Sequence, residues 1–103
     1  MYELMAVFAI LRLGRNAYGV PISQEIEAQS GRRVAVSGVY AALERLERKG
    51  LVTAELGEAT PQRGGRAQTY FRLTAKGLEE ANTAKRALTN LWHGTPGLKE
   101  RSA

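Results

Sequence analysis

Two groups of residues in the chain have the types and spacing that suit contact with a nucleic acid. The first group follows Val36 in a segment of helical periodicity, and its candidate members are Ser37, Gly38, Tyr40, Ala41, Arg45 and Lys49. The second group is the run Arg63-Gly64-Gly65-Arg66. Arginine can grip a phosphate or enter a narrow minor groove, and two glycines permit a tight turn from which both guanidinium groups project. The sequence therefore predicts two surfaces that contact DNA.

The first group requires a helix that holds it toward solvent. Val39, Leu43 and Leu46 recur at helical spacing and form the expected inward stripe of this helix. We expect Ser37 to be its N-cap and Gly50 to end it. A major groove about 12 Å wide admits one α-helix, and the residues near the N-terminus of that helix meet the base edges.

Each candidate on this helix has a role that suits its chemistry. Gly38 and Ala41 are small enough for close approach to the DNA, and Ser37 can donate a hydrogen bond to a phosphate. Tyr40 can either bind a phosphate or pack inward. Arg45 can reach a base edge or the DNA backbone.

The alternative to a recognition helix is an ordinary amphipathic surface helix. Lys49 is a weaker phosphate candidate, because a cation near a helix C-terminus also stabilises the helix dipole. Glu44 and Glu47 interrupt the basic face, and acidic and basic residues at this spacing usually form solvated ion pairs.

The second group requires a β-hairpin. Residues 51–56 and 68–73 alternate as strands do, and Pro61 and the two glycines supply turn residues between them. Long loops of this kind are often functional. A solvated loop is the alternative, but a basic hairpin directly after the helix favours a wing. Helix and hairpin together predict a winged helix-turn-helix domain, in an α+β fold that is mostly α.

The N-terminal helix, expected over residues 2–13, is apolar on nearly every side. A helix of this kind must be buried on several sides, and in so small a domain a second subunit is the expected cover. Gly14 is a natural end for this helix, because glycine tolerates positive φ.

A second helix is expected after a turn at residues 16–19. Pro21 fits its first turn, and Ser30-Gly31 ends it. Residues 32–36 then alternate in a way that predicts a short extended segment.

The last helix is expected from about Ala75 to about Trp92, capped by Thr74. The predicted organisation is a DNA-binding domain over residues 1–73, a dimerisation helix over 74–93 and a flexible tail over 94–103.

Composition narrows the class of function. The chain has 103 residues and a formal charge of +5, which favours a polyanionic partner such as nucleic acid, with solubility alone as the alternative. It has no cysteine, which excludes disulfides and thiolate chemistry. Neither a nucleophile-elbow motif nor a phosphate-binding P-loop is present, so we expect no enzyme, no catalytic residue and no cofactor. Without a signal-peptide or membrane-spanning pattern, we expect a soluble cytoplasmic protein.

Two residues near the end of the last helix have side chains that can bind ligands. Trp92 can stack on a flat aromatic molecule, although packing within an interface is the simpler interpretation. His93 has no second histidine and no cysteine with which to share a metal ion, so no metal site is expected.

In these segments the chain resembles the small branch of the PadR family of winged helix-turn-helix transcriptional regulators. The matching segments are Leu11-Arg12-Leu13-Gly14, Asn16-Ala17-Tyr18-Gly19, residues 39–47, Lys49-Gly50-Leu51-Val52, Arg63-Gly64-Gly65-Arg66 and Tyr70-Phe71-Arg72-Leu73-Thr74. Together they cover roughly residues 2 to 90. Family members usually carry several residues before the position of Tyr2, so the resemblance implies either a shortened first helix or a misassigned start of that helix.

The resemblance implies a homodimeric repressor that binds a pseudo-palindromic operator in double-stranded DNA. It implies that the third helix reads the major groove, that the wing touches the DNA backbone, and that the first and last helices build the dimer. It also implies a possible small aromatic effector at Trp92. Two other functions stay open: a winged-helix module that binds another protein, and a small-molecule sensor.

Overall fold

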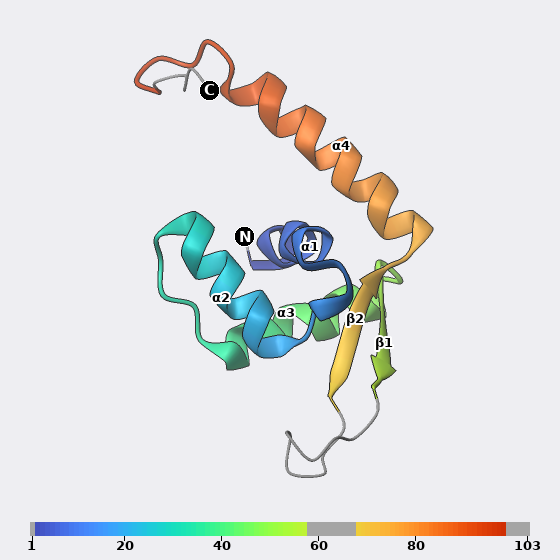
Figure 1. The fold of residues 1–103 in the computed structure, drawn as a ribbon. Coiled ribbons are helices and arrows are strands. Elements are labelled where there is room, and N and C mark those ends of the chain that lie inside the picture. The colour runs from blue at the N-terminus through green and yellow to red at the C-terminus, as the bar shows by residue number, and fades with distance from the viewer. Residues whose placement is uncertain (1, 58–67, 99–103) are drawn as a thin grey trace.

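The computed structural model describes residues 2–57 and 68–98. Its elements are α1 (Tyr2–Leu13), the 3₁₀ turn η1 (Gly14–Asn16), α2 (Gly19–Ser30), α3 (Val36–Arg48), β1 (Val52–Leu56), β2 (Thr69–Leu73) and α4 (Ala75–Trp92). Figure 1 shows α1, α2 and α3 beside the antiparallel pair β1 and β2, with α4 leading away from them. This mostly helical fold with a small sheet confirms the predicted winged helix-turn-helix class. The wing tip Arg63-Gly64-Gly65-Arg66 and residues 99–103 of the expected tail lie outside the described residues.

The helix boundaries follow mainly from capping chemistry. Thr74 caps α4 as predicted, because its Oγ1 accepts a hydrogen bond from Gly77 N at 3.0 Å. Gly31 ends α2 in the left-handed conformation, at φ +73, and donates its N–H to the carbonyl of Glu27. Gly50 takes the same conformation just after α3, at φ +76.

The prediction that Ser37 caps α3 is wrong. The helix begins at Val36 after Ala35, and no side chain caps it among the described residues. The entering loop is fixed by tertiary contacts instead: Val34 is buried, and its carbonyl accepts a hydrogen bond from the buried Ser23 Oγ at 2.8 Å. With this anchor, Ala35 takes the N-cap position, and the helix starts two residues earlier than it would with Ser37 as its cap. Residues 33–35 form a loop and join neither strand of the described sheet.

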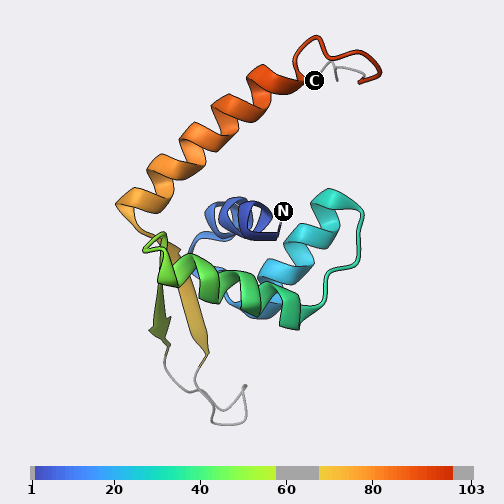
Figure 2. The ribbon, with the colours of Figure 1, turned by 180° about the vertical axis from the view of Figure 1, so that it is seen from behind.

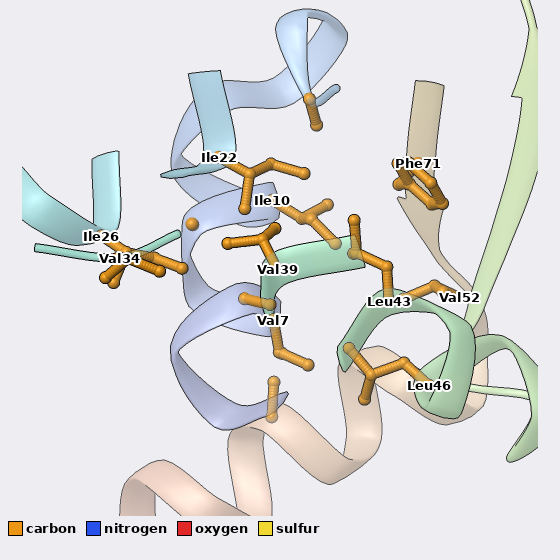
Figure 3. Packing of buried hydrophobic residues seen from close by; sticks show 14 residues of the cluster. Val7, Ile10, Ile22, Ile26, Val34, Val39, Leu43, Leu46, Val52 and Phe71 are labelled. Carbon is orange, nitrogen blue, oxygen red and sulfur yellow. The ribbon is translucent and has the colours of Figure 1, made fainter. Parts of the chain in front are cut away.

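The core lies where α1, α2 and α3 converge on the sheet. Figure 3 shows its aliphatic side chains directed toward one another from these elements. The predicted stripe of Val39, Leu43 and Leu46 is confirmed, since all three are at most 2 % exposed. Helix α1 contacts α2, α3, β2 and α4, so much of its apolar surface is covered within one chain.

The sheet joins the core to the last helix. β1 and β2 pair antiparallel with Val52 opposite Leu73 and Leu56 opposite Thr69. Gly77, in the first turn of α4, lies directly on the carbonyl of Leu51, where an added Cβ would overlap the oxygen. Beyond this contact α4 extends past the other helices, as the two opposite views show (Figures 1 and 2).

Candidate nucleic-acid interface

The outward face of α3 is defined by what the helix buries. Its buried residues are Val39, Ala42, Leu43 and Leu46. At 3.6 residues per turn, the line opposite to them consists of Ser37, Ala41, Glu44 and Arg48, all of which are exposed. Ser37 and Ala41 were predicted at the DNA and lie on this line. Arg48 was left out of the predicted set, although its spacing of seven residues from Ala41 indicates the same face.

Arg45 and Lys49 lie on one flank of this line, beside the start of α1. Arg45 Nε donates to Glu3 Oε2 at 3.0 Å, and Lys49 Nζ donates to Glu3 Oε1 at 2.6 Å. These hydrogen bonds, from Lys49 first and Arg45 second, hold the pKa of the Glu3 carboxyl below its ordinary value. Both predicted cations are therefore held by a carboxylate from a segment more than forty residues away.

Gly38 lies on the same flank and is close to α1. A Cβ at this position would approach Cε2 of Tyr2 to 2.9 Å. Its lack of a side chain thus accommodates the Tyr2 ring. This is a structural reason for the glycine, separate from the predicted close approach to DNA.

Tyr40 lies on the other flank and combines the two roles that its sequence position left open. Its ring packs edge-on against Phe71 at a centroid distance of 6.5 Å. The same ring fills the space beside Gly19, where any Cβ would clash with the phenol. The residue is nevertheless 43 % exposed, so the side chain packs on the body and still meets solvent.

The base of the wing is fixed to the turn that precedes α2. Phe71 N donates to the carbonyl of Ala17 at 2.8 Å, and the rings of Tyr18 and Tyr70 stack edge to face at 5.4 Å. Gly57 N donates to Gln68 O at 2.6 Å, which continues the pairing of the hairpin beyond β1. The two strands therefore leave the body in a defined direction, and Figure 1 shows them beside α3.

The predicted DNA-binding set did not include two arginines that lie just before α3. Arg32 and Arg33 are exposed in the loop between α2 and α3. They border a surface hollow that Tyr2 and Met5 also line. Adjacent arginines just before a helix N-terminus were the available signal, because backbone amides and nearby cations together suit a phosphate.

The residues considered for small ligands lie apart from α3. Trp92 is 42 % exposed at the end of α4. A different hollow of about 270 Å³ lies between α1 and α2, with Met5, Phe8 and Ile26 among its lining residues. In the described part of the chain no group of His, Cys, Asp and Glu is arranged to hold a metal ion.

A helix-turn-helix followed by a β-hairpin defines the winged-helix class of proteins. A sequence model of the PadR-like family of transcriptional regulators matches residues 7–83. The chain therefore belongs to the PadR-like family, whose members are transcriptional regulators and not enzymes.

Solved structures of regulators share this fold. A PadR family transcription regulator from Clostridium difficile is 21 % identical with a TM-score of 0.68, and the match covers 90 % of this chain and 98 % of that one. A Streptococcus transcriptional regulator is 20 % identical with a TM-score of 0.71, and the match covers 95 % of this chain and 94 % of that one. A transcriptional regulator from Clostridium thermocellum is 24 % identical with a TM-score of 0.69, and the match covers 87 % of this chain and 82 % of that one. Comparison with curated protein sequences gives no significant match. Of the helices that the structure describes, none has the length and apolar character to cross a membrane.

Proposed function

We propose that this PadR-like regulator binds double-stranded DNA sequence-specifically as a homodimer, and represses transcription from a pseudo-palindromic operator in the cytoplasm. Each subunit would place its α3 in the major groove of one half-site. The single observation that carries this proposal is the outward line of α3. Small residues at its N-terminal end permit close approach to bases, and Arg48 lies at its C-terminal end.

Basic residues lie before this line and on one of its flanks, while Glu44 lies on the line itself. Arg32 and Arg33 precede the helix, and Arg45 and Lys49 flank it. Neutralisation of phosphates by such cations releases counterions and supplies much of the affinity for DNA. The predicted wing residues Arg63, Gly64, Gly65 and Arg66 would add contacts to the DNA backbone next to the groove, since β1, which leads to them, contacts α3.

A continuous face of α4 supports the homodimer. Gly77 and Ala81 are buried against the body, and the same face continues at helical spacing through Ala84 and Leu88 to Trp92. Leu88 and Trp92 are exposed because α4 extends past the other helices. A second copy related by a two-fold axis would cover this face with the same face of its own α4 and with α1.

Trp92 also supports a narrower proposal, namely release of DNA by a flat aromatic effector. Its ring is part of the α4 face that a second copy would cover, so a ligand stacked there would lie at the subunit interface. Quenching of Trp92 fluorescence by flat aromatic compounds, together with loss of DNA binding, is the expected result. Quenching without any effect on DNA binding would remove the effector from the proposal.

The decisive experiment is a titration of the protein into labelled duplex DNA at 50, 100 and 200 mM salt. We expect affinity to fall steeply with salt. Arg48→Ala, Arg63→Ala and Arg66→Ala should each weaken binding to specific and random duplexes and lower the salt slope by about 1 per subunit. Arg86→Ala is the matched control, because it removes one exposed arginine from the outward side of α4. Absence of salt-dependent DNA binding by the wild-type protein would favour the alternative, a winged-helix module that binds another protein.

A further inference from the structure

The contact between the start of α1 and the end of α3 brings one carboxylate to two cations of the candidate DNA-binding surface. Arg45 donates a hydrogen bond to one carboxylate oxygen of Glu3, and Lys49 donates to the other. Arg45 and Lys49 lie one helical turn apart on the same flank of α3, so a single side chain from α1 reaches both. The three groups together carry one net positive charge where α3 alone would present two.

We propose that Glu3 is a built-in competitor of DNA phosphate, which sets the affinity of the α1-side flank of α3 for DNA. This inference rests on the proposed DNA binding. A phosphate oxygen and a carboxylate oxygen seek the same donors, the guanidinium of Arg45 and the ammonium of Lys49. DNA must therefore either displace Glu3 from these donors or bind them while a carboxylate remains close to the phosphate.

The exposure of the contact makes displacement feasible. The side chains of Arg45 and Lys49 are 44 % and 57 % exposed, and that of Glu3 is 30 % exposed. Ion pairs with this exposure stabilise a fold only weakly, so the pairs can open without loss of the helix packing. The guanidinium bond to Glu3 runs through Nε, and an arginine that donates through Nε can still donate to a phosphate through its terminal amino groups.

The chain contains a matched control. Glu25 on α2 accepts from Arg12 Nε at 2.7 Å and from Gln29. Like Glu3, it is a carboxylate paired with an arginine of another helix, and its replacement changes the net charge by the same amount. Its hydrogen-bond partners lie on α1 and α2, and neither belongs to α3. Glu3→Gln and Glu25→Gln therefore share the global electrostatic effect and differ only in whether cations of α3 are released.

The experiment measures binding of wild type, Glu3→Gln and Glu25→Gln to a random duplex between 50 and 200 mM salt. We expect Glu3→Gln to bind several-fold more tightly than Glu25→Gln at 50 mM salt, with a salt slope steeper by about 1 per subunit. Per subunit, that slope would shrink the advantage roughly three- to fourfold by 200 mM salt. A circular dichroism spectrum of each variant serves as the control that the variant is folded.

A double-mutant cycle tests whether the effect passes through the two cations. In an Arg45→Gln/Lys49→Gln background, Glu3→Gln should match Glu25→Gln. Equal affinities of Glu3→Gln and Glu25→Gln in the otherwise wild-type chain would overturn the inference, as would weaker binding by Glu3→Gln, which would show that Glu3 positions the cations for DNA. If the wild-type protein itself shows no salt-dependent binding, the proposed function fails first, so the two failures are distinguishable.

Discussion

Helices α3 and α4 have similar amphipathic patterns but opposite environments. The apolar face of α3 is covered within the chain, and Leu43 is 1 % exposed. On α4 only Gly77 and Ala81 are buried, while Leu88 is 47 % and Leu91 74 % exposed. An amphipathic pattern therefore shows that a face must be covered, but it does not show which chain supplies the cover. In our proposal the apolar face of α3 packs in the core of its own subunit, and the apolar face of α4 packs in the dimer interface.

The comparison predicts its largest effect at Leu43. Leu43→Ala should lower the free energy of unfolding by about 2–5 kcal/mol, because it leaves a cavity among fully packed neighbours. Urea unfolding followed by circular dichroism, at one fixed protein concentration, measures this loss. A loss below about 1 kcal/mol would mean that the core relaxes around the cavity and is less tightly packed than the structure indicates.

Leu88→Ala is the counterpart on α4. At protein concentrations too low for dimers we expect it to change stability by no more than about 0.5 kcal/mol, as is usual for exposed positions. At high concentration the wild-type melting temperature should rise with concentration, as mass action requires for a dimer, and Leu88→Ala should weaken that rise. A Leu88→Ala loss as large as that of Leu43→Ala in dilute solution would erase the contrast between the helices.

The two helices also differ in what their glycines contact. Gly77→Ala should cost about 1–3 kcal/mol, because its Cβ meets the backbone carbonyl of Leu51, which cannot rotate away. In Gly38→Ala the Cβ meets only the ring edge of Tyr2, a movable side chain, and the gain in helix propensity offsets the contact. For a domain of this size each kcal/mol shifts the melting temperature by about 4–8 °C. Equal melting temperatures for the two variants would show that α4 can shift on Leu51 without cost.

The sequence predicted the parts of the fold that depend on local periodicity and on end signals. The apolar stripe of α3, the glycine after it and the Thr74 cap of α4 were all correct, because each depends on residues within a few positions of one another. The predicted start of α3 was wrong: Ala35 takes the N-cap position, and a buried hydrogen bond from Ser23 to the carbonyl of Val34 holds the residue before it. Cap preference is a local tendency that such a tertiary contact overrides.

In the candidate site too, the features that depend on local spacing could be predicted, and those that depend on tertiary contacts could not. The exposure of Ser37 and Ala41 could be read from helical spacing, but the pairing of Glu3 with Arg45 and Lys49 joins segments far apart in the chain and leaves no periodic signal. The contact of Gly19 with Tyr40 is similar: the sequence shows a turn glycine, and only the fold shows which ring requires it. The predicted roles in DNA binding stay predictions until binding is measured.

The smallest expected effect concerns acid stability at the α1–α3 contact. Because the pKa of Glu3 is lower in the folded chain than its ordinary value of 4.5, its ion pairs stabilise the fold above about pH 4.5 and lose this contribution as pH falls through the lowered pKa. Glu3→Gln removes the titrating group, so between pH 5 and pH 3 its free energy of unfolding should decline less than that of wild type. The difference should shrink in high salt, because the pairs are exposed and screened. Urea unfolding at each pH measures both curves, and parallel curves would mean that the Glu3 pairs with Arg45 and Lys49 are too transient in solution to contribute, which would also weaken the case for Glu3 as a competitor of phosphate.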